Sequence, residues 1–183
     1  RGPVSPCSIG QFRDGDFRSE HAPFRIDISN ASQVASVTKE LIGEGWYGVK
    51  LEGAIRDRAS RRVSIKNALE QLPDRANRVT LGEGKDALGL PVPRIAWNVD
   101  DYVVKGTEAT RRRYDEIAAQ LGATNVKHSK AGKFGNRQHI TGTLSMGNDP
   151  ADSVTDAFGR AHDHPNLYMA GTGVMPTVGT CNV

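Results

Sequence analysis

The sequence predicts an α+β fold in which a mainly antiparallel sheet is flanked by helices. Four or five segments before residue 100 alternate apolar and polar residues, which is the pattern of half-buried strands. Two other segments carry apolar residues at helical spacing, and a glycine follows each of them. With 183 residues, of which 37% are hydrophobic and 25% charged, the chain can bury one sizeable core or two small ones.

The first elements are expected to be an irregular segment, a strand and a helix. Residues 1–23 are rich in glycine, proline and charge, which is typical of irregular structure. Alternation over 24–28 predicts the strand. Apolar residues on one face of 34–41 predict the helix, which residues 30–32 can cap and which Gly43 and Gly45 end.

Further strands are expected up to residue 98, and a second helix follows them. The strands are expected at 49–51, 62–66, 78–82 and 94–98, with a short turn at 67–73 and a rigid proline connector at 89–93. The helix is expected from about Thr107 to Leu121, with Tyr114, Ile117 and Ala118 on its apolar stripe. From about residue 125 the sequence consists of short apolar segments separated by glycines. The predicted domain boundaries therefore divide the chain into 1–23, 24–126 and 127–183.

Composition argues against several classes of function. The 24 basic and 21 acidic residues leave a net charge of +3 without the dense basic stripe of a nucleic-acid-binding surface. Cys7 and Cys181 show no metal or redox spacing and leave the question of a disulfide open. No stretch approaches the ~18 apolar residues of a membrane span, and the compartment, cytoplasmic or periplasmic, stays open. Because the chain starts without methionine and stops directly after a motif, we expect a fragment.

The chemistry is carried by a series of short motifs that begins at a histidine. Residues 139–147 read HITGTLSMG, and the elements that follow are DP at 149–150, SVTD at 153–156, HDHPNLY at 162–168 and PTVGTCN at 176–182. In this order the motifs resemble the C-terminal signature of the glucose-methanol-choline (GMC) oxidoreductases, which are flavin-dependent. Segments at 70–73, 77–81 and 86–91 also resemble the substrate-domain strands of bacterial members, so the resemblance covers roughly two thirds of the chain.

The resemblance implies a role for each part of the chain. Residues 24–126 correspond to the family's substrate-binding domain. Residues 127–183 correspond to a catalytic segment that contacts FAD and returns to an FAD-binding α/β domain, which this chain lacks, and 1–23 correspond to the tail of a preceding domain. By matching position, His139 and Asn182 are the catalytic pair. Contacts to the cofactor are expected from Gly171, Thr172, Asn182 and Val183, although many relatives carry an acidic residue where this sequence has Gly171.

Such a pair suits the oxidation of a CH–OH group on a sugar or related polyol. Hydride leaves the alcohol carbon only as the hydroxyl proton leaves, and the neutral imidazole of His139 can accept that proton. The neutral amide of Asn182 can donate a hydrogen bond to the oxygen that becomes negative. Electrons then pass to oxygen, a quinone or a cytochrome. Because the sequence has no Gly-x-Gly-x-x-Gly after a strand, we expect these 183 residues alone to be inactive and to bind FAD weakly.

Other classes of function fit the sequence less well. A non-catalytic binding or assembly subunit of a flavoenzyme would tolerate loss of His139 and Asn182, and both are present. A hydrolase would use Ser145 or Ser153 with His139, but the sequence has no Gly-x-Ser-x-Gly elbow. A metal site is not expected, because neither the two histidines at 162 and 164 nor the aspartates of 149–156 have ligand spacing.

Overall fold

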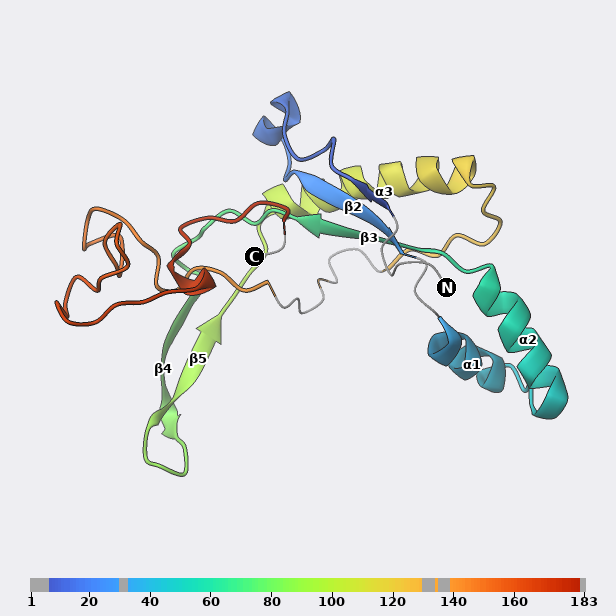
Figure 1. Cartoon of the computed structure of the whole chain (residues 1–183), viewed down its shortest axis with the longest axis horizontal. Helices are drawn as coiled ribbons and strands as arrows, with labels where there is room; N and C mark the ends of the chain where they lie inside the picture. The colour runs from blue at the N-terminus through green and yellow to red at the C-terminus, as the bar shows by residue number, and fades with distance from the viewer. Residues whose placement is uncertain (1–6, 30–32, 130–133, 135–138, 182–183) are drawn as a thin grey trace. The chain divides into compact units, whose positions relative to one another are not determined.

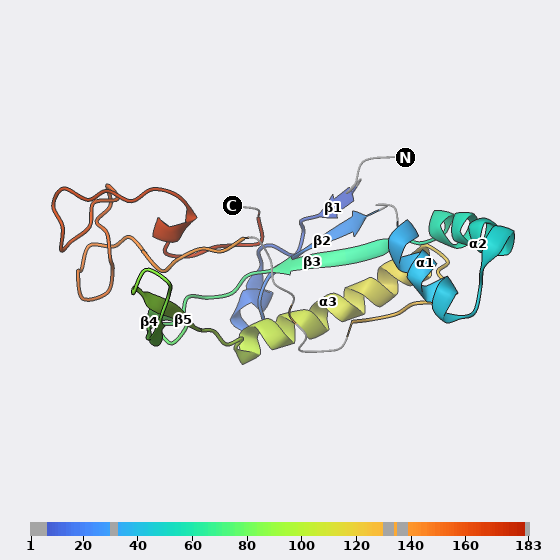
Figure 2. The ribbon, with the colours of Figure 1, turned by 90° about the horizontal axis from the view of Figure 1, so that it is seen from below.

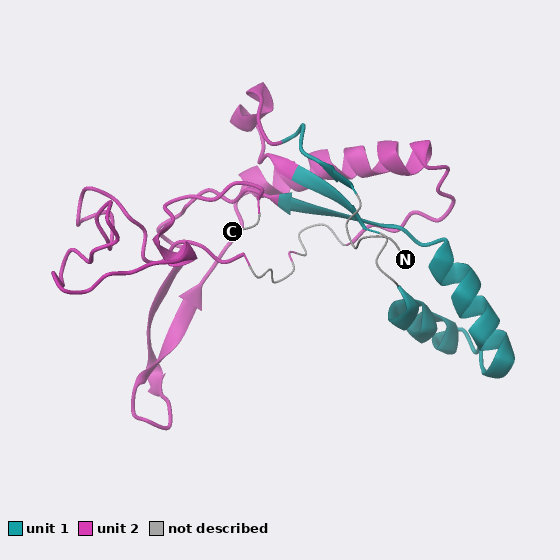
Figure 3. Ribbon diagram, viewed as in Figure 1, with its two compact units in different colours: residues 1–12, 25–68 teal, residues 13–24, 69–183 magenta. Residues whose placement is uncertain are grey.

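The computed structural model describes residues 7–29, 33–129, 134 and 139–181. Three helices and two sheets are present in this part of the chain (Figure 1), which agrees with the predicted α+β class. None of the described helices is long and apolar enough to cross a lipid bilayer. The chain divides into two compact units, one formed by residues 1–12 and 25–68 and the other by residues 13–24 and 69–183 (Figure 3).

The first unit contains a three-stranded sheet in the order β1-β2-β3, seen in Figure 2. Its strands are β1 (Cys7–Ile9), β2 (Phe24–Ser29) and β3 (Ser64–Leu69), and the end residues Phe24 and Leu69 belong to the second unit. β1 and β2 pair antiparallel, with Cys7 opposite Ile28 and Ile9 opposite Ile26. The expected strand at 24–28 is confirmed, and its alternation places Phe24 and Ile26 in the core, 2% and 0% exposed.

A helical hairpin connects β2 to β3. It consists of α1 (Val34–Gly43) and α2 (Gly48–Ser60), and the expected helix at 34–41 is therefore confirmed. Gly45 ends α1 with φ +86°, so that its N–H bonds to the carbonyl of Ile42 and that of Trp46 to the carbonyl of Leu41. This is a Schellman motif, which fixes the direction in which the chain leaves the helix.

Two arginine–carboxylate pairs hold this helical hairpin and the residues after it together. Arg58 donates to both carboxylate oxygens of Glu44 at 2.7 and 3.0 Å. Arg62 donates to both carboxylate oxygens of Glu40 at 3.0 and 2.6 Å. Forked pairs of this kind impose a defined geometry as well as attraction.

The expected strand at 49–51 is wrong, because these residues form the first turn of α2. Val49 and Leu51 alternate like strand residues, but Leu51, Ile55 and Ala59 recur every four residues and are half-buried. The apolar spacing of a helix over the longer segment therefore determines its structure, and the short alternation at 49–51 does not. The expectation of an irregular N-terminal segment is also incorrect in part, since β1 and a short 3-10 helix, η1 (Asp16–Ser19), lie within it.

The second unit contains α3 (Asp101–Gln120), which begins six residues before the expected start. The Asp100 side chain accepts a hydrogen bond from the Val103 N–H at 3.0 Å and caps the helix. Val103, Gly106, Ala109, Thr110 and Ala118 form its buried face. Gly106 lies so close to Ala22 and Leu69 that a Cβ there would be 2.8–2.9 Å from their atoms.

Strands β4 (Arg78–Lys85) and β5 (Pro91–Ala96) form an antiparallel hairpin in the same unit (Figure 1). Val79 pairs with Ile95 and Leu81 with Pro93, so one face of the hairpin is apolar, whereas the pairs that involve Arg78 and Arg94 lie on the other face. The apolar face is exposed, with Ile95 73% and Leu81 79% accessible.

Candidate functional site

The histidine motif (residues 139–147) runs beside a glycine turn (Gly171–Gly173) about thirty residues further along the chain. Three backbone amides of the motif donate hydrogen bonds to carbonyl oxygens of residues 172–174. The pairs are Gly142 to Thr172 at 3.2 Å, Leu144 to Gly173 at 3.0 Å and Met146 to Val174 at 2.9 Å. The two segments, drawn in orange and red in Figure 1, are therefore fixed to each other by main-chain contacts.

Unusual backbone conformations shape both segments. Gly142 and Thr143 have φ angles of +81° and +71°, and Thr143 is the one described residue other than glycine with positive φ. A β-branched residue rarely adopts this conformation, and such residues concentrate at functional sites. Gly171 has φ +114°, and it precedes the short 3-10 helix η2 (Thr172–Val174).

The structure places some of the predicted site residues and leaves others outside its described range. His139 is exposed, three residues before the first backbone contact with the glycine turn. Gly171 and Thr172 are exposed as well, and a Cβ on Gly171 would project into open space. Asn182 and Val183 lie outside the described residues, so the predicted pair of His139 and Asn182 stays a prediction.

A buried threonine supports the histidine motif. Thr155 is 0% exposed, and its hydroxyl donates to the carbonyl of Leu144 at 3.3 Å. The Thr155 carbonyl accepts from the Gly147 N–H at 2.9 Å, and the Ser145 carbonyl accepts from the Val154 N–H at 2.9 Å. The SVTD motif thus holds the histidine motif in place through these hydrogen bonds.

Asp156, in the same SVTD motif, holds the next turn. One carboxylate oxygen accepts from the N–H groups of Phe158 and Arg160 at 2.9 and 3.0 Å, and the other accepts from the Arg160 guanidinium at 3.2 Å. Desolvation of the carboxyl by itself would raise its pKa, but these hydrogen bonds and the charge of Arg160 together lower the pKa below 3.8.

Ser153 and His162 form the one serine–histidine hydrogen bond among the described residues, at 2.8 Å. The Ser153 hydroxyl also lies 2.6 Å from the carbonyl oxygen of Asp149, to which it donates. With its proton given to a carbonyl, the hydroxyl is left to accept from the imidazole, which is the reverse of what a serine nucleophile needs. The pair therefore has a structural role, and the hydrolase hypothesis gains no support from it.

The sequence reasoning missed Thr143, Thr155 and Gly159. Gly159 has φ +77° and is buried, and a Cβ there would lie 2.6 Å from the carbonyl oxygen of Met169. An aspartate three residues before a glycine, as in Asp156-Ala157-Phe158-Gly159, is a turn signal from which Gly159 could have been found. No such signal exists for Thr143 or Thr155.

Comparison with known proteins identifies relatives of this part of the chain. Residues 73–183 match the family model for the C-terminal domain of GMC oxidoreductases. The chain is 41% identical to the fructose dehydrogenase large subunit of Gluconobacter japonicus over 182 residues, which are 99% of this chain and 33% of that protein. It is 32% identical to the paromamine 6′-oxidase of Streptomyces fradiae over 120 residues, which are 66% of this chain and 22% of that protein.

A third relative is a dehydrogenase. The 2-methyl-1,2-propanediol dehydrogenase of Mycolicibacterium austroafricanum is 33% identical over 114 residues, which are 62% of this chain and 21% of that protein. The chain thus spans between a fifth and a third of the length of these three relatives. Their names refer to fructose, to paromamine and to a diol, all acted on by an oxidase or a dehydrogenase.

Proposed function

The chain belongs to the GMC oxidoreductase family, and from this membership we propose that the protein oxidises a CH–OH group of a sugar or polyol with FAD as cofactor. The observation that carries the proposal is the main-chain pairing of the histidine motif with the glycine turn. This pairing joins the segment that follows the exposed His139 to the turn that contains the exposed Gly171 and Thr172. The relatives named for fructose, paromamine and a diol support a hydroxylated substrate.

In this proposal His139 is the general base. His139 is exposed and lies three residues before the first hydrogen-bonded residue of its motif, so its ring is accessible to a substrate hydroxyl and can take the proton at its unprotonated ring nitrogen. Asn182 donates a hydrogen bond to the alcohol oxygen and orients it, which favours the build-up of negative charge there. A proton acceptor and a hydrogen-bond donor on the same hydroxyl together promote its ionisation.

The glycine turn fits a contact with a large, flat cofactor. Gly171 is exposed, has a conformation that L side chains rarely adopt, and has open space where a Cβ would project. We expect Gly171, Thr172, Asn182 and Val183 to contact FAD, and residues 127–183 to return to an FAD-binding domain outside this chain. When bound, FAD supplies the acceptor for the substrate hydride. The 183 residues alone are expected to bind FAD weakly and to be inactive.

The test is made on the full-length protein with its flavin. We expect a flavin absorption band that sugars or polyols bleach in the absence of air. His139→Gln should slow this bleaching about 10²–10⁴-fold while the flavin band is kept, since a general base contributes that much. His164→Gln is the matched control, because His164 is also exposed, and it should react at the normal rate. Absence of a flavin band, or an unchanged rate in His139→Gln, would contradict the proposal.

We further propose that the protein works as the flavin-carrying subunit of an assembly. The relative that matches 99% of the chain is named a large subunit, which implies at least one other subunit in that enzyme. Electrons would then leave for a cytochrome or a quinone, or for oxygen if no partner is present. A non-catalytic assembly subunit is the rival proposal, and it predicts that no substrate bleaches a flavin.

A further inference from the structure

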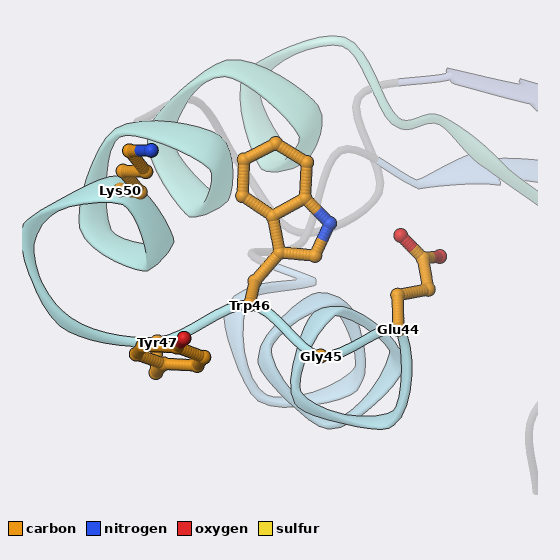
Figure 4. A pocket seen from close by; sticks show the side chains of 5 residues that line it. All are labelled: Glu44, Gly45, Trp46, Tyr47 and Lys50. Carbon is orange, nitrogen blue, oxygen red and sulfur yellow. The ribbon is translucent and has the colours of Figure 1, made fainter.

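The turn between α1 and α2 exposes a group of large apolar side chains. Ile42, Trp46, Tyr47 and Val49, which we call the aromatic tip, are 58%, 41%, 82% and 88% exposed. Figure 4 shows the Trp46 indole directed into the space beside the helices and the Tyr47 ring directed away from it. Glu44, Gly45 and Lys50 join the two aromatic residues around an open pocket of about 390 Å³. Exposed apolar patches of this kind mark interaction surfaces.

The backbone conformation of the turn fixes the positions of these side chains. The Schellman motif at Gly45 sets the exit of α1, and Gly48, with φ +63°, sets the entry of α2. The forked pair of Arg58 with Glu44 connects the end of α1 to the last turn of α2. The tip is thus held in place before binding, which reduces the entropy lost when a partner docks.

The charge near the tip is unbalanced. Each of the four acidic residues between positions 33 and 62 forms a salt bridge with an arginine, and the pairs are Glu40–Arg62, Glu44–Arg58, Glu52–Arg56 and Asp57–Arg61. Lys39 and Lys50 form no salt bridge with any residue that the structure describes. Lys39 lies one helical turn before Ile42, and Lys50 lines the pocket with Tyr47. Two uncompensated positive charges therefore flank an apolar centre.

The helical hairpin is also set apart by the comparisons. It lies outside residues 73–183, which match the family model, yet it lies inside the 182-residue match to the fructose dehydrogenase large subunit. The segment is thus shared with a relative that is named as one subunit of a larger enzyme, and it is not part of the family's common C-terminal domain.

We propose that the aromatic tip is the docking surface for a second, different subunit. That subunit would offer an apolar pocket to Tyr47 and Val49 and carboxylates to Lys39 and Lys50. An apolar centre with a charged rim is the usual anatomy of a protein interface, and tyrosine is enriched among the residues that dominate binding. The inference rests on the proposed assembly, but it does not depend on the chemistry at His139.

The experiment uses the full-length flavoprotein, purified from its own cells with the polypeptides that accompany it. A photo-crosslinking residue replaces the most exposed aromatic residue, as Tyr47→p-benzoylphenylalanine. In parallel, Tyr47→Asp combined with Val49→Asp places two carboxylates on the tip. Leu88→Asp is the matched control, because Leu88 is 83% exposed in the loop between β4 and β5. Association is measured by mass photometry of a dilution series, and the flavin band is recorded for each variant.

We expect irradiation to attach the residue at position 47 to a different polypeptide that is present at one copy per flavoprotein. The double variant should bind that polypeptide at least ~30-fold more weakly, as the loss of a central anchor does, with its flavin band unchanged. Leu88→Asp should bind normally. Because association is read by mass, the result stands even if substrates fail to bleach the flavin.

Several outcomes would overturn the inference. A crosslink to another segment of the same chain, accompanied by loss of flavin in the double variant, would mean that the tip packs within its own protein. A crosslink to a second copy would mean a homodimer. Loss of binding to phosphatidylglycerol vesicles, with the second subunit still bound, would mean that the tip contacts a lipid surface. Normal association in the double variant would also contradict the proposal.

Discussion

Two helical glycines give opposite predictions for the same substitution. Replacing glycine with alanine inside a helix normally stabilises it by about 1 kcal/mol, since alanine loses less backbone entropy. Gly53 in α2 has nothing within 4 Å of the position where a Cβ would lie. Gly53→Ala should therefore raise the free energy of unfolding by about 1 kcal/mol.

Gly106→Ala in α3 should instead lower the free energy of unfolding. The new Cβ would lie 2.8 Å from the Ala22 carbonyl oxygen, 2.8 Å from Leu69 Cδ2 and 2.9 Å from Ala22 Cβ. Favourable contacts between carbon atoms lie near 3.5–4.0 Å, so the helix must move by about 1 Å. Overpacking of this kind costs about 1–3 kcal/mol. Two of the three clashing atoms sit on or next to the backbone and cannot rotate away, so we expect a net loss of about 1–2 kcal/mol.

The assay is urea unfolding of the two variants and the parent protein, followed by circular dichroism. Together the two estimates place the variants about 2–3 kcal/mol apart, a difference that the unfolding midpoints resolve easily. A Gly106→Ala protein as stable as the parent, or more stable, would refute the close approach of α3 to Ala22 and Leu69. An unstable Gly53→Ala protein would refute the exposure of that side of α2.

Three further predictions concern other parts of the chain. Glu70→Gln removes the half-buried ion pair with Arg18 and should cost about 1–2 kcal/mol of unfolding free energy. Burial, and then the charge of Glu70, raise the pKa of Tyr102, so the same variant should lower that pKa in an ultraviolet titration. Because the pKa of Asp156 is lowered in the folded state, the ionised carboxyl stabilises the fold above pH 3.8, and this stabilisation is lost as the pH falls through the folded-state pKa. Asp156→Asn should remove this part of the pH dependence of stability, as measured by thermal unfolding at several pH values. Gly82→Ala should destabilise the protein by more than about 1 kcal/mol, since its Cβ would lie 2.6 Å from a carbonyl oxygen of β5, whereas Gly84→Ala, with nothing within 4 Å, is the control in the same unfolding assay.

Much of the fold could be predicted from the sequence wherever one period dominates a segment. β2 and α1 lie where their apolar patterns place them. The strand expected at 49–51 failed because three residues are too few to separate a strand from the start of a helix. The early start of α3 was missed because its first turn is held by the Asp100 cap, a local hydrogen bond rather than an apolar stripe.

The candidate site was less accessible to sequence reasoning. Motif order alone pointed to His139, Gly171 and Thr172, but the hydrogen bonds that join their two segments form between residues about thirty positions apart. No local propensity encodes such pairing. The left-handed conformation of Thr143 was also invisible, because threonine disfavours that conformation and only the surrounding contacts impose it.

The β4–β5 hairpin has a practical consequence for anyone who produces this chain by itself. In the described part of the chain neither outer edge of the hairpin pairs with another strand. Pro91 and Pro93 remove N–H donors from β5 and blunt its edge, but β4 has no proline, and Gly82 and Gly84 leave little side-chain bulk along it. Beside an exposed apolar face, that open edge is a template for strand exchange between molecules. We therefore expect concentrated solutions of the isolated chain to aggregate through β4, and solubilising changes belong on that strand first.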